Sequence, residues 1–504
     1  MKLLSYFFIV LCLFLSGCGV IVGTIVDTAT NVVTYPIKEY VFLGAYKYDN
    51  SWDEPYVPMS EKKDLGDVIL GIAVSGGGSR SAYFMACVME ELSKIPIEPG
   101  SNKTYLDELD YISSVSGGSL ASAYYCLMRY HPEYAHKEDF FKKFKEAMSS
   151  DFQWRTLFRY CILGRWFLDT FTYYDRGDLL AGIWDDLFFH NMTFEDLKVA
   201  EKNGAPTLLI NGTNMHDGSR FVFSTLPIEN YNQCQYLKEI RNASLQSKKL
   251  TKYQSLKGMG FKHLNSDIRP YRISKAVLAS AAVPNLLGPV TLRNYTDKTE
   301  KNLINIVDGG VYDNYGVETL FQVIGEILDK NPGRKAKILL IDGSGYFQKE
   351  HKTNDSYTVA DYSSRPLEIS WMRNKMYVEY IWQKAKTYSI NGIRPYKNAS
   401  FNLLSLYNIE LPSQEQAKTW HSRGLWQIMT SPDQALENIQ LGINTNITAL
   451  EKLVNIPTSF ALSEKDAISI EEQAKQVVKT LLTKQISSYE PTPNAVIIDP
   501  NLHN

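Results

Sequence analysis

Short apolar runs alternate with helical apolar periodicity along the first two thirds of the chain. The run Val68–Val74 is continuously apolar, which is typical of a parallel strand covered on both faces. Several glycines follow it, and then apolar residues recur at helical spacing until Pro96 ends the pattern; these are Met85, Val88, Met89 and Leu92. Strands that alternate with helices in this way predict the α/β class.

A second unit of strand, turn and helix lies around residues 110–130. A small apolar strand runs into Gly117 and Gly118 and then directly into residues with helical spacing, namely Leu120, Ala123, Tyr124, Leu127 and Met128. A serine at such a turn projects its hydroxyl away from the sheet, next to the unpaired N–H groups of a helix start. Ser116 is therefore the candidate nucleophile.

Further elements continue the alternation. The predicted strands are Thr207–Ile210, Phe221–Phe223, Leu303–Val307, Lys337–Ile341 and Leu403–Ile409; the predicted helices are Ile273–Val283, a segment from Val317 to Leu328, Trp371–Tyr388 and Ile470–Leu482. The polar stretch 230–265 is predicted to be a surface excursion.

The domain boundaries follow from these patterns. Residues 67–350 are predicted to form the main domain, in which the aromatic-rich segment at about 131–191 is either a cap over an apolar pocket or ordinary core. Residues 351–504 are rich in helical patterns, and they either complete this domain or extend it.

The first residues have the pattern of an export signal. Lys2 precedes an uncharged apolar run, Leu3–Leu15, that is too short to span a membrane. The small residues before Cys18 resemble the lipobox of bacterial lipoproteins, which implies a signal peptide over 1–17, acylation of Cys18 and a linking arm over 18–66. Alternatives are an ordinary secretory signal and an uncleaved anchor. The resemblance implies a location in the bacterial cell envelope, with the outer membrane favoured because Gly19 is not aspartate.

Charge and cysteine content narrow the function further. The chain of 504 residues has 53 basic and 55 acidic residues, a formal charge of -2, so no global charge favours nucleic acid as a partner. Beyond the signal and Cys18, the chain has four cysteines: Cys87, Cys126, Cys161 and Cys234. They could form disulfides or be buried free thiols. Neither their spacing nor that of the histidines indicates a metal site.

Three loops that follow predicted strands carry the chemistry of ester cleavage. The carboxyl ends of parallel strands meet at one edge of a sheet, so we expect these loops to converge. Ser116 would attack the carbonyl and Asp308 would take its proton, with Gly117, Gly118, Gly309 and Gly310 allowing close approach. The amides of Gly76, Gly77 and Gly78 would form the oxyanion hole, with Arg80 bracing the loop or adding positive field.

These motifs resemble those of the patatin-like phospholipases. The matching stretches are Gly76-Gly77-Gly78-Ser79-Arg80, Ser114-Val115-Ser116-Gly117-Gly118, Ser280-Ala281-Ala282-Val283-Pro284 and Asp308-Gly309-Gly310. The resemblance implies a three-layer α/β/α fold with a mainly parallel sheet, and a Ser116–Asp308 dyad that hydrolyses phospholipids or other acyl esters without metal or cofactor. The sequence departs from the family pattern at Ser114 and Ser81, where glycine is usual.

Two other functions fit the same sequence. One is a hydrolase with a Ser-Asp-His triad, for which His351 and His421 lie downstream of Asp308. The other is an inactive, membrane-anchored binding or structural lipoprotein, suggested by the two departures from the motif.

Overall fold

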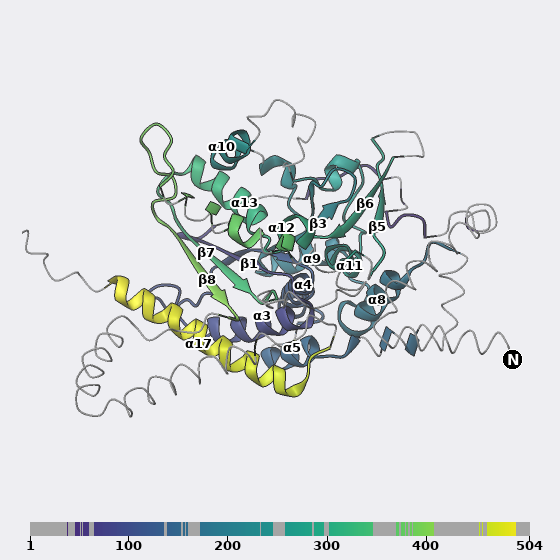
Figure 1. Cartoon of the computed structure of the whole chain (residues 1–504), viewed down its shortest axis with the longest axis horizontal. Helices are drawn as coiled ribbons and strands as arrows, with labels where there is room; N and C mark the ends of the chain where they lie inside the picture. Colours follow the sequence, from purple (N-terminus) through teal and green to yellow (C-terminus); the bar gives the residue numbers. More distant parts are fainter. Residues whose placement is uncertain are drawn as a thin grey trace, which may run out of the picture.

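One sheet of eight strands runs through the structure (Figure 1). The computed structural model describes the chain from residue 46 to residue 489 apart from several gaps, of which the longest are 160–171, 245–257, 346–368 and 408–452. The strand order is β5-β6-β3-β2-β1-β7-β8, and β4 pairs with β3. The strands are β1 Val68–Val74, β2 Leu109–Val115, β3 Thr207–Asn214, β4 Arg220–Phe223, β5 Val290–Arg293, β6 Leu303–Asp308, β7 Lys335–Asp342 and β8 Ala399–Ser405.

The sheet is mainly parallel, as predicted. Strands β8, β7, β1, β2 and β3 pair in parallel, whereas β4, β5 and β6 join by antiparallel pairing. The expectation that Asp308 follows a parallel strand is wrong, because β6 runs antiparallel to β3, with Asp308 opposite Gly212. The last residue of β2, Val115, pairs with Asn211, so β6 ends beside the same part of β3 that β2 reaches.

Helices cover both faces of the sheet. Leu70, Ile72 and Val74 of β1 face one apolar core, and Ile69 and Ala73 face the other, because successive strand residues point to opposite faces. Helices of the first core are α3 Gly78–Leu92, α4 Gly117–Tyr130, α5 Phe140–Met148, α8 Arg176–Trp184, α9 Phe194–Lys202, α11 Ile273–Ala281 and α17 Glu464–Tyr489; those of the second are α10 Gln235–Ser244 and α13 Val317–Lys330. The three-layer prediction is confirmed.

Three expectations need correction or refinement. The segment 230–265 is not wholly a surface excursion, because α10 buries Tyr236 and Leu237 against α13. Strand β8 begins at Ala399, four residues before its predicted start. In the aromatic segment at about 131–191, Phe144 and Phe152 are buried in the core and Phe158 is exposed, while 160–171 lie outside the described residues.

Residues 46–59 form a strap across the domain. The Asp49 N–H donates to the Thr291 carbonyl of β5, the Trp52 indole donates to the Asp267 carbonyl at 3.0 Å, and Asn50 bonds the Arg293 backbone. At the other end of the chain, β8 pairs with β7 and α17 packs on α3. No helix in the described part of the chain is long and apolar enough to cross a membrane.

The described cysteines form no disulfide. Cys87, Cys126 and Cys234 are buried thiols, and burial raises the pKa of the Cys87 thiol. Cys18 and Cys161 lie outside the described residues. A buried thiol with a raised pKa is a poor nucleophile, so Cys87 acts as a small apolar group of the core.

Candidate active site

Ser116 occupies a sharp turn between β2 and α4. Its φ of 54° is a left-handed value that non-glycine residues rarely adopt, and the helix begins at the next residue. A side chain at Gly117 would overlap the backbone of Gly78, and one at Gly118 would come within 2.6 Å of the Ser75 carbonyl oxygen. The two glycines therefore let the elbow pack directly against the loop that follows β1.

Asp308 lies against the Ser116 hydroxyl. Its carboxyl group accepts the Gly310 N–H at 2.6 Å, and only 2% of the residue is exposed. Burial raises the pKa of Asp308 from 3.8 to about 7, although the Gly310 N–H and the nearby Ser116 side chain lower it in part. A carboxylate with this pKa is a stronger base than an ordinary aspartate, so burial provides the basicity that proton abstraction from a serine requires.

The glycine loop lies beside the elbow. The Gly76 N–H donates to the Asn314 carbonyl at 2.9 Å and is thus engaged within the protein, while a Cβ built on Gly76 would lie 3.3 Å from the Ser116 Cβ. Gly77 and Gly78 both have positive φ values and open α3, where the first N–H groups have no acceptor within the helix. Their amides are the candidate donors to an oxyanion.

Arg80 points away from Ser116. Its guanidinium donates to the Gly343 carbonyl at 3.0 Å and to the Ile456 carbonyl at 2.6 Å, and it is almost fully buried. The structure thus gives Arg80 the bracing role, connecting α3 to the end of β7 and to a C-terminal segment. Burial lowers the pKa of Arg80, and the charges of Tyr407 and Asp342 partly offset this shift.

Several residues at the site were not singled out individually from the sequence. Ser280 of α11 accepts the Ser116 N–H at 2.9 Å, and the Asn211 side chain donates to Ser113 Oγ and to the Ser114 carbonyl. The Trp371 indole nitrogen lies 3.1 Å from the position of a Cβ on Gly310. Ser280 was visible only as part of a small-residue helix end, and Asn211 only as a turn residue, since each acts through contacts distant in sequence.

Ser114 and Ser81, the two departures from the family pattern, differ in their hydrogen bonding. Ser81 Oγ donates to the Ser75 carbonyl at 2.6 Å, so this hydroxyl holds the glycine loop. Ser114 Oγ is buried and has no hydrogen-bond partner within the described residues.

We expect Ser114→Ala to raise the free energy of unfolding by about 1 kcal/mol, because it removes a buried hydroxyl that lacks a partner. Urea denaturation would measure this. Ser113→Ala, at the preceding residue, is the matched control. Ser113 Oγ donates to the Gly316 carbonyl at 2.6 Å and accepts from the Asn211 side chain at 2.9 Å. Its loss should lower the same free energy by about 1–2 kcal/mol. A lower stability of Ser114→Ala would contradict the assignment.

The described residues contain no cluster of histidine, cysteine, aspartate or glutamate that would hold a metal ion. His351 and His421 lie outside the described residues. Ser116, Asp308 and the glycine loop are the candidate nucleophile, base and oxyanion donors of this arrangement.

The chain is similar to one protein family and to several solved structures. Residues 72–321 match the family model described as "Patatin-like phospholipase". Among solved structures, the chain is similar to human GIVD cytosolic phospholipase A2 in complex with methyl gamma-linolenyl fluorophosphonate and terbium chloride, at 11% identity and a TM-score of 0.38, covering 92% of this chain and 64% of that one. A complex of the same human enzyme with the fluorophosphonate gives 12% identity, a TM-score of 0.35 and coverage of 85% and 60%. The chain thus spans less than two thirds of these enzymes, and no curated protein matches it.

Proposed function

Since the chain belongs to the patatin-like phospholipase family, we propose that it is an active serine hydrolase that cleaves lipid acyl esters with a Ser116–Asp308 dyad. The observation that carries the proposal is the position of the Ser116 side chain, at a strained elbow, beside the buried Asp308 carboxyl. Direct contact of nucleophile and base lets the proton pass between them without an intervening histidine.

The first half of the reaction forms an acyl-enzyme. Ser116 Oγ attacks the ester carbonyl carbon while its proton passes to the Asp308 carboxylate. The negative oxygen of the tetrahedral intermediate accepts hydrogen bonds from the amides of Gly77 and Gly78. When the intermediate collapses, the bond to the leaving alcohol breaks and the alcohol oxygen takes the proton from Asp308.

The second half releases the acid. Asp308 takes a proton from a water molecule, whose oxygen attacks the acyl carbon. The Ser116 oxygen then leaves and recovers the proton from Asp308, which restores the starting state and releases a fatty acid. The same carboxyl group therefore alternates between base and acid, as a pKa of about 7 favours near neutral pH.

Apolar side chains near α12 (Gly310–Asp313) support a lipid substrate. A cavity of about 170 Å³ there is lined by the apolar or aromatic residues Tyr312, Tyr377, Val378 and Ile381 and by the polar residues Asp313, Glu318 and Asn374. Exposed apolar side chains occur on the same part of the chain: Ile369, Met376, Tyr377 and Tyr380. Exposed apolar groups gathered on one segment of the chain favour contact with a lipid or an apolar ligand.

Labelling with a fluorophosphonate tests the function. The full-length protein in detergent should hydrolyse a short-chain nitrophenyl ester and lysophospholipid micelles, and mass spectrometry should locate the phosphonate on Ser116. Ser116→Ala should lose both turnover and label. Equal turnover in wild type and Ser116→Ala, or a label on another residue, would overturn the proposal.

Removal of the two downstream histidines separates the dyad from a triad. We expect the double variant His351→Ala, His421→Ala to keep kcat/KM within about threefold of wild type, because Asp308 already contacts Ser116. Ester hydrolysis assays on both proteins measure this ratio. A loss of several orders of magnitude would favour the triad.

We also propose that Cys18 carries the lipid that anchors the protein in the bacterial cell envelope, with the outer membrane favoured. The support is the apolar run Leu3–Leu15 followed by small residues before Cys18. Cells fed an alkynyl fatty acid should incorporate it into the wild type and not into Cys18→Ser. Equal incorporation in both would contradict the anchor.

A further inference from the structure

The carboxyl-terminal end of α11 contacts both the nucleophile Ser116 and the segment that carries its base. Ser280, one residue before the end of this helix, accepts the Ser116 N–H at 2.9 Å through its hydroxyl oxygen. The same hydroxyl lies 3.0 Å from Ser119 Oγ in α4 and donates to the Asn211 carbonyl at 2.6 Å. One buried side chain thus joins the elbow, α4 and β3.

These contacts use the full hydrogen-bonding capacity of Ser280. A serine hydroxyl has one donor and two acceptor positions. Here the proton goes to the Asn211 carbonyl, and the two acceptor positions receive the Ser116 N–H and the Ser119 hydroxyl. No capacity remains for substrate, so any effect of Ser280 on the reaction acts through Ser116.

The backbone of the same helix end holds Asp308. The Gly309 N–H donates to the Ser280 carbonyl at 3.2 Å, and the Asp308 N–H donates to the Ala282 carbonyl at 2.9 Å. The nucleophile is therefore held by the side chain of this segment and the base by its main chain. A shift of the helix end would move the two reacting groups relative to each other.

Ser116 needs such restraint because its backbone is strained. A φ of 54° is rarely adopted by a non-glycine residue and persists only when neighbouring structure holds it. The bond to Ser280 satisfies the N–H of this residue in the strained conformation. Without the bond, the elbow can relax and the contact between Ser116 and Asp308 loosens.

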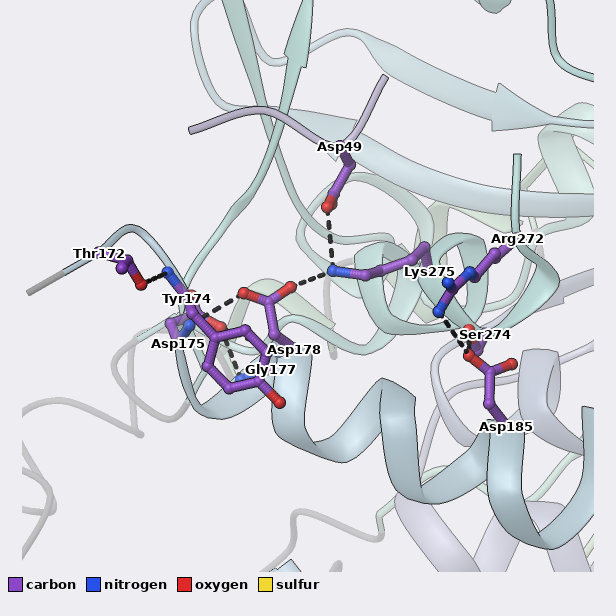
Figure 2. A network of polar contacts seen from close by, with 10 residues as sticks. All are labelled: Asp49, Thr172, Tyr174, Asp175, Gly177, Asp178, Asp185, Arg272, Ser274 and Lys275. Atoms are coloured by element: carbon purple, nitrogen blue, oxygen red, sulfur yellow. Dashed lines mark hydrogen bonds and ion pairs between the residues drawn. The ribbon is translucent and has the colours of Figure 1, made fainter. Parts of the chain in front are cut away.

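The opposite end of α11 is fixed by charges (Figure 2). Lys275 bonds Asp178 of α8 and lies 2.9 Å from Asp49 of the strap, and Ser274 donates to Asp185 at 2.8 Å. The short helix is thus anchored at its start, so the position of Ser280 is set independently of the catalytic groups. This arrangement suits a fixed support for the elbow.

We propose that Ser280 is a positioning residue, whose hydroxyl sets the placement of the Ser116 nucleophile relative to Asp308. The proposal rests on the proposed hydrolase function. Ser280 lies outside the dyad and the glycine loop. It affects the rate of the chemical step and makes no contact with substrate.

Ser280→Ala tests the proposal with Ser274→Ala as matched control. Both remove the hydroxyl of a buried serine from the same helix, but Ser274 bonds Asp185 and lies away from Ser116. In Ser280→Ala we expect kcat on a nitrophenyl ester to fall about 10- to 100-fold with KM within twofold, because misplacement of reacting groups lowers the rate without loss of binding. Ser274→Ala should lose stability and keep kcat within twofold.

The pH profile supplies a readout that a purely structural role would not move. The nearby Ser116 side chain lowers the pKa of Asp308, so moving Ser116 away should shift the acid limb of kcat to higher pH in Ser280→Ala. If Ser280→Ala does not fold, Ser280→Cys replaces it as the test variant. The cysteine side chain has nearly the same shape as serine, but its sulfur is a weak hydrogen-bond donor and acceptor. It should therefore show the same fall in kcat and the same shift of the acid limb.

The outcomes separate the two proposals. Wild-type kcat and an unchanged acid limb in the folded Ser280 variant would overturn the positioning role alone, provided that Ser116→Ala is inactive. Equal activity of wild type and Ser116→Ala would mean that the hydrolase function itself has failed. A fall in kcat for Ser280 and not for Ser274, together with the shifted limb, supports the positioning role.

Discussion

Asp308→Asn is expected to lower kcat by about 10³-fold and to stabilise the fold above neutral pH. The activity falls because asparagine cannot accept the Ser116 proton, and a positioned general base contributes about 10²–10⁴-fold. The stability rises because asparagine is neutral, whereas the buried Asp308 carboxyl must ionise above its pKa of about 7.

The sign of the stability change follows from linkage. Burial raises the pKa of Asp308 in the folded protein, so between pH 4 and 7 the folded state binds more protons than the unfolded state, and this residue makes the protein less stable as the pH rises. Below about pH 4 the group is protonated in both states and contributes no penalty. Asp308→Asn should therefore gain on the order of 2–4 kcal/mol at pH 8 and little at pH 4, measured by urea denaturation at both values.

Asp342→Asn provides the matched control. Asp342 ends β7, is fully buried, accepts the Ser344 N–H at 3.1 Å and pairs with Lys375 at 3.2 Å. Loss of this carboxylate leaves Lys375 without a counter-charge, so the control should be destabilised and remain active. The wild-type acid limb of kcat/KM should have its midpoint near pH 7. Full activity of Asp308→Asn would exclude this residue as the base.

Lys275→Ala is expected to cost about 3–5 kcal/mol of unfolding free energy at pH 8. Lys275 lies between Asp49 and Asp178 (Figure 2), and Asp178 in turn accepts the Asp175 N–H at 2.9 Å. Removing one partner of a buried ion pair leaves charges without compensation. Burial lowers the pKa of Lys275, but the charges of Asp49 and Asp178 outweigh this effect and raise it.

The loss should depend on pH. Burial raises the pKa of Asp49, and burial together with the Asp178 charge raises the pKa of Asp175 to about 7. Without Lys275 the folded state would retain protons on these carboxyls to still higher pH, so the destabilisation should be largest above pH 7 and should shrink toward pH 4. Lys330→Ala, which removes an exposed partner of Glu326 on α13, should cost less than about 1 kcal/mol. Equal costs for the two variants would contradict the buried role of Lys275.

The elements that sequence patterns predict well are those whose burial is set locally. Val68–Val74 matches β1 at both ends because a continuous apolar run between polar residues fits only a strand covered on both faces. Helices α3, α4 and α13 follow from their apolar periodicity in the same way. Strand β5 was not predicted, since only two of its four residues are buried and the pattern is too short to recognise.

The candidate site was predictable in its chemistry and not in its connections. Small residues after strands identify Ser116, Asp308 and the glycine loop because those turns admit few other residue types. The direction of β6 was not predictable, because an apolar run does not indicate which strand it will pair with or whether the pairing is parallel. Ser280 and Asn211 act on the elbow from positions 164 and about 100 residues away, so their roles depend on tertiary contacts that leave no local pattern.

The strap and the C-terminal elements imply that the segment recognised as a family unit is smaller than the unit that folds. A fragment that spans only residues 72–321 would lack the first residues of β1 and both β7 and β8. It would also lack Asp49, the partner of Lys275. It would also remove α17 from the apolar face of α3 and both carbonyl acceptors from Arg80. The boundaries of the family match therefore differ from those of the unit that folds cooperatively. A protease cut between residues 49 and 68 should lower the free energy of unfolding of the whole domain and not merely remove a terminal segment.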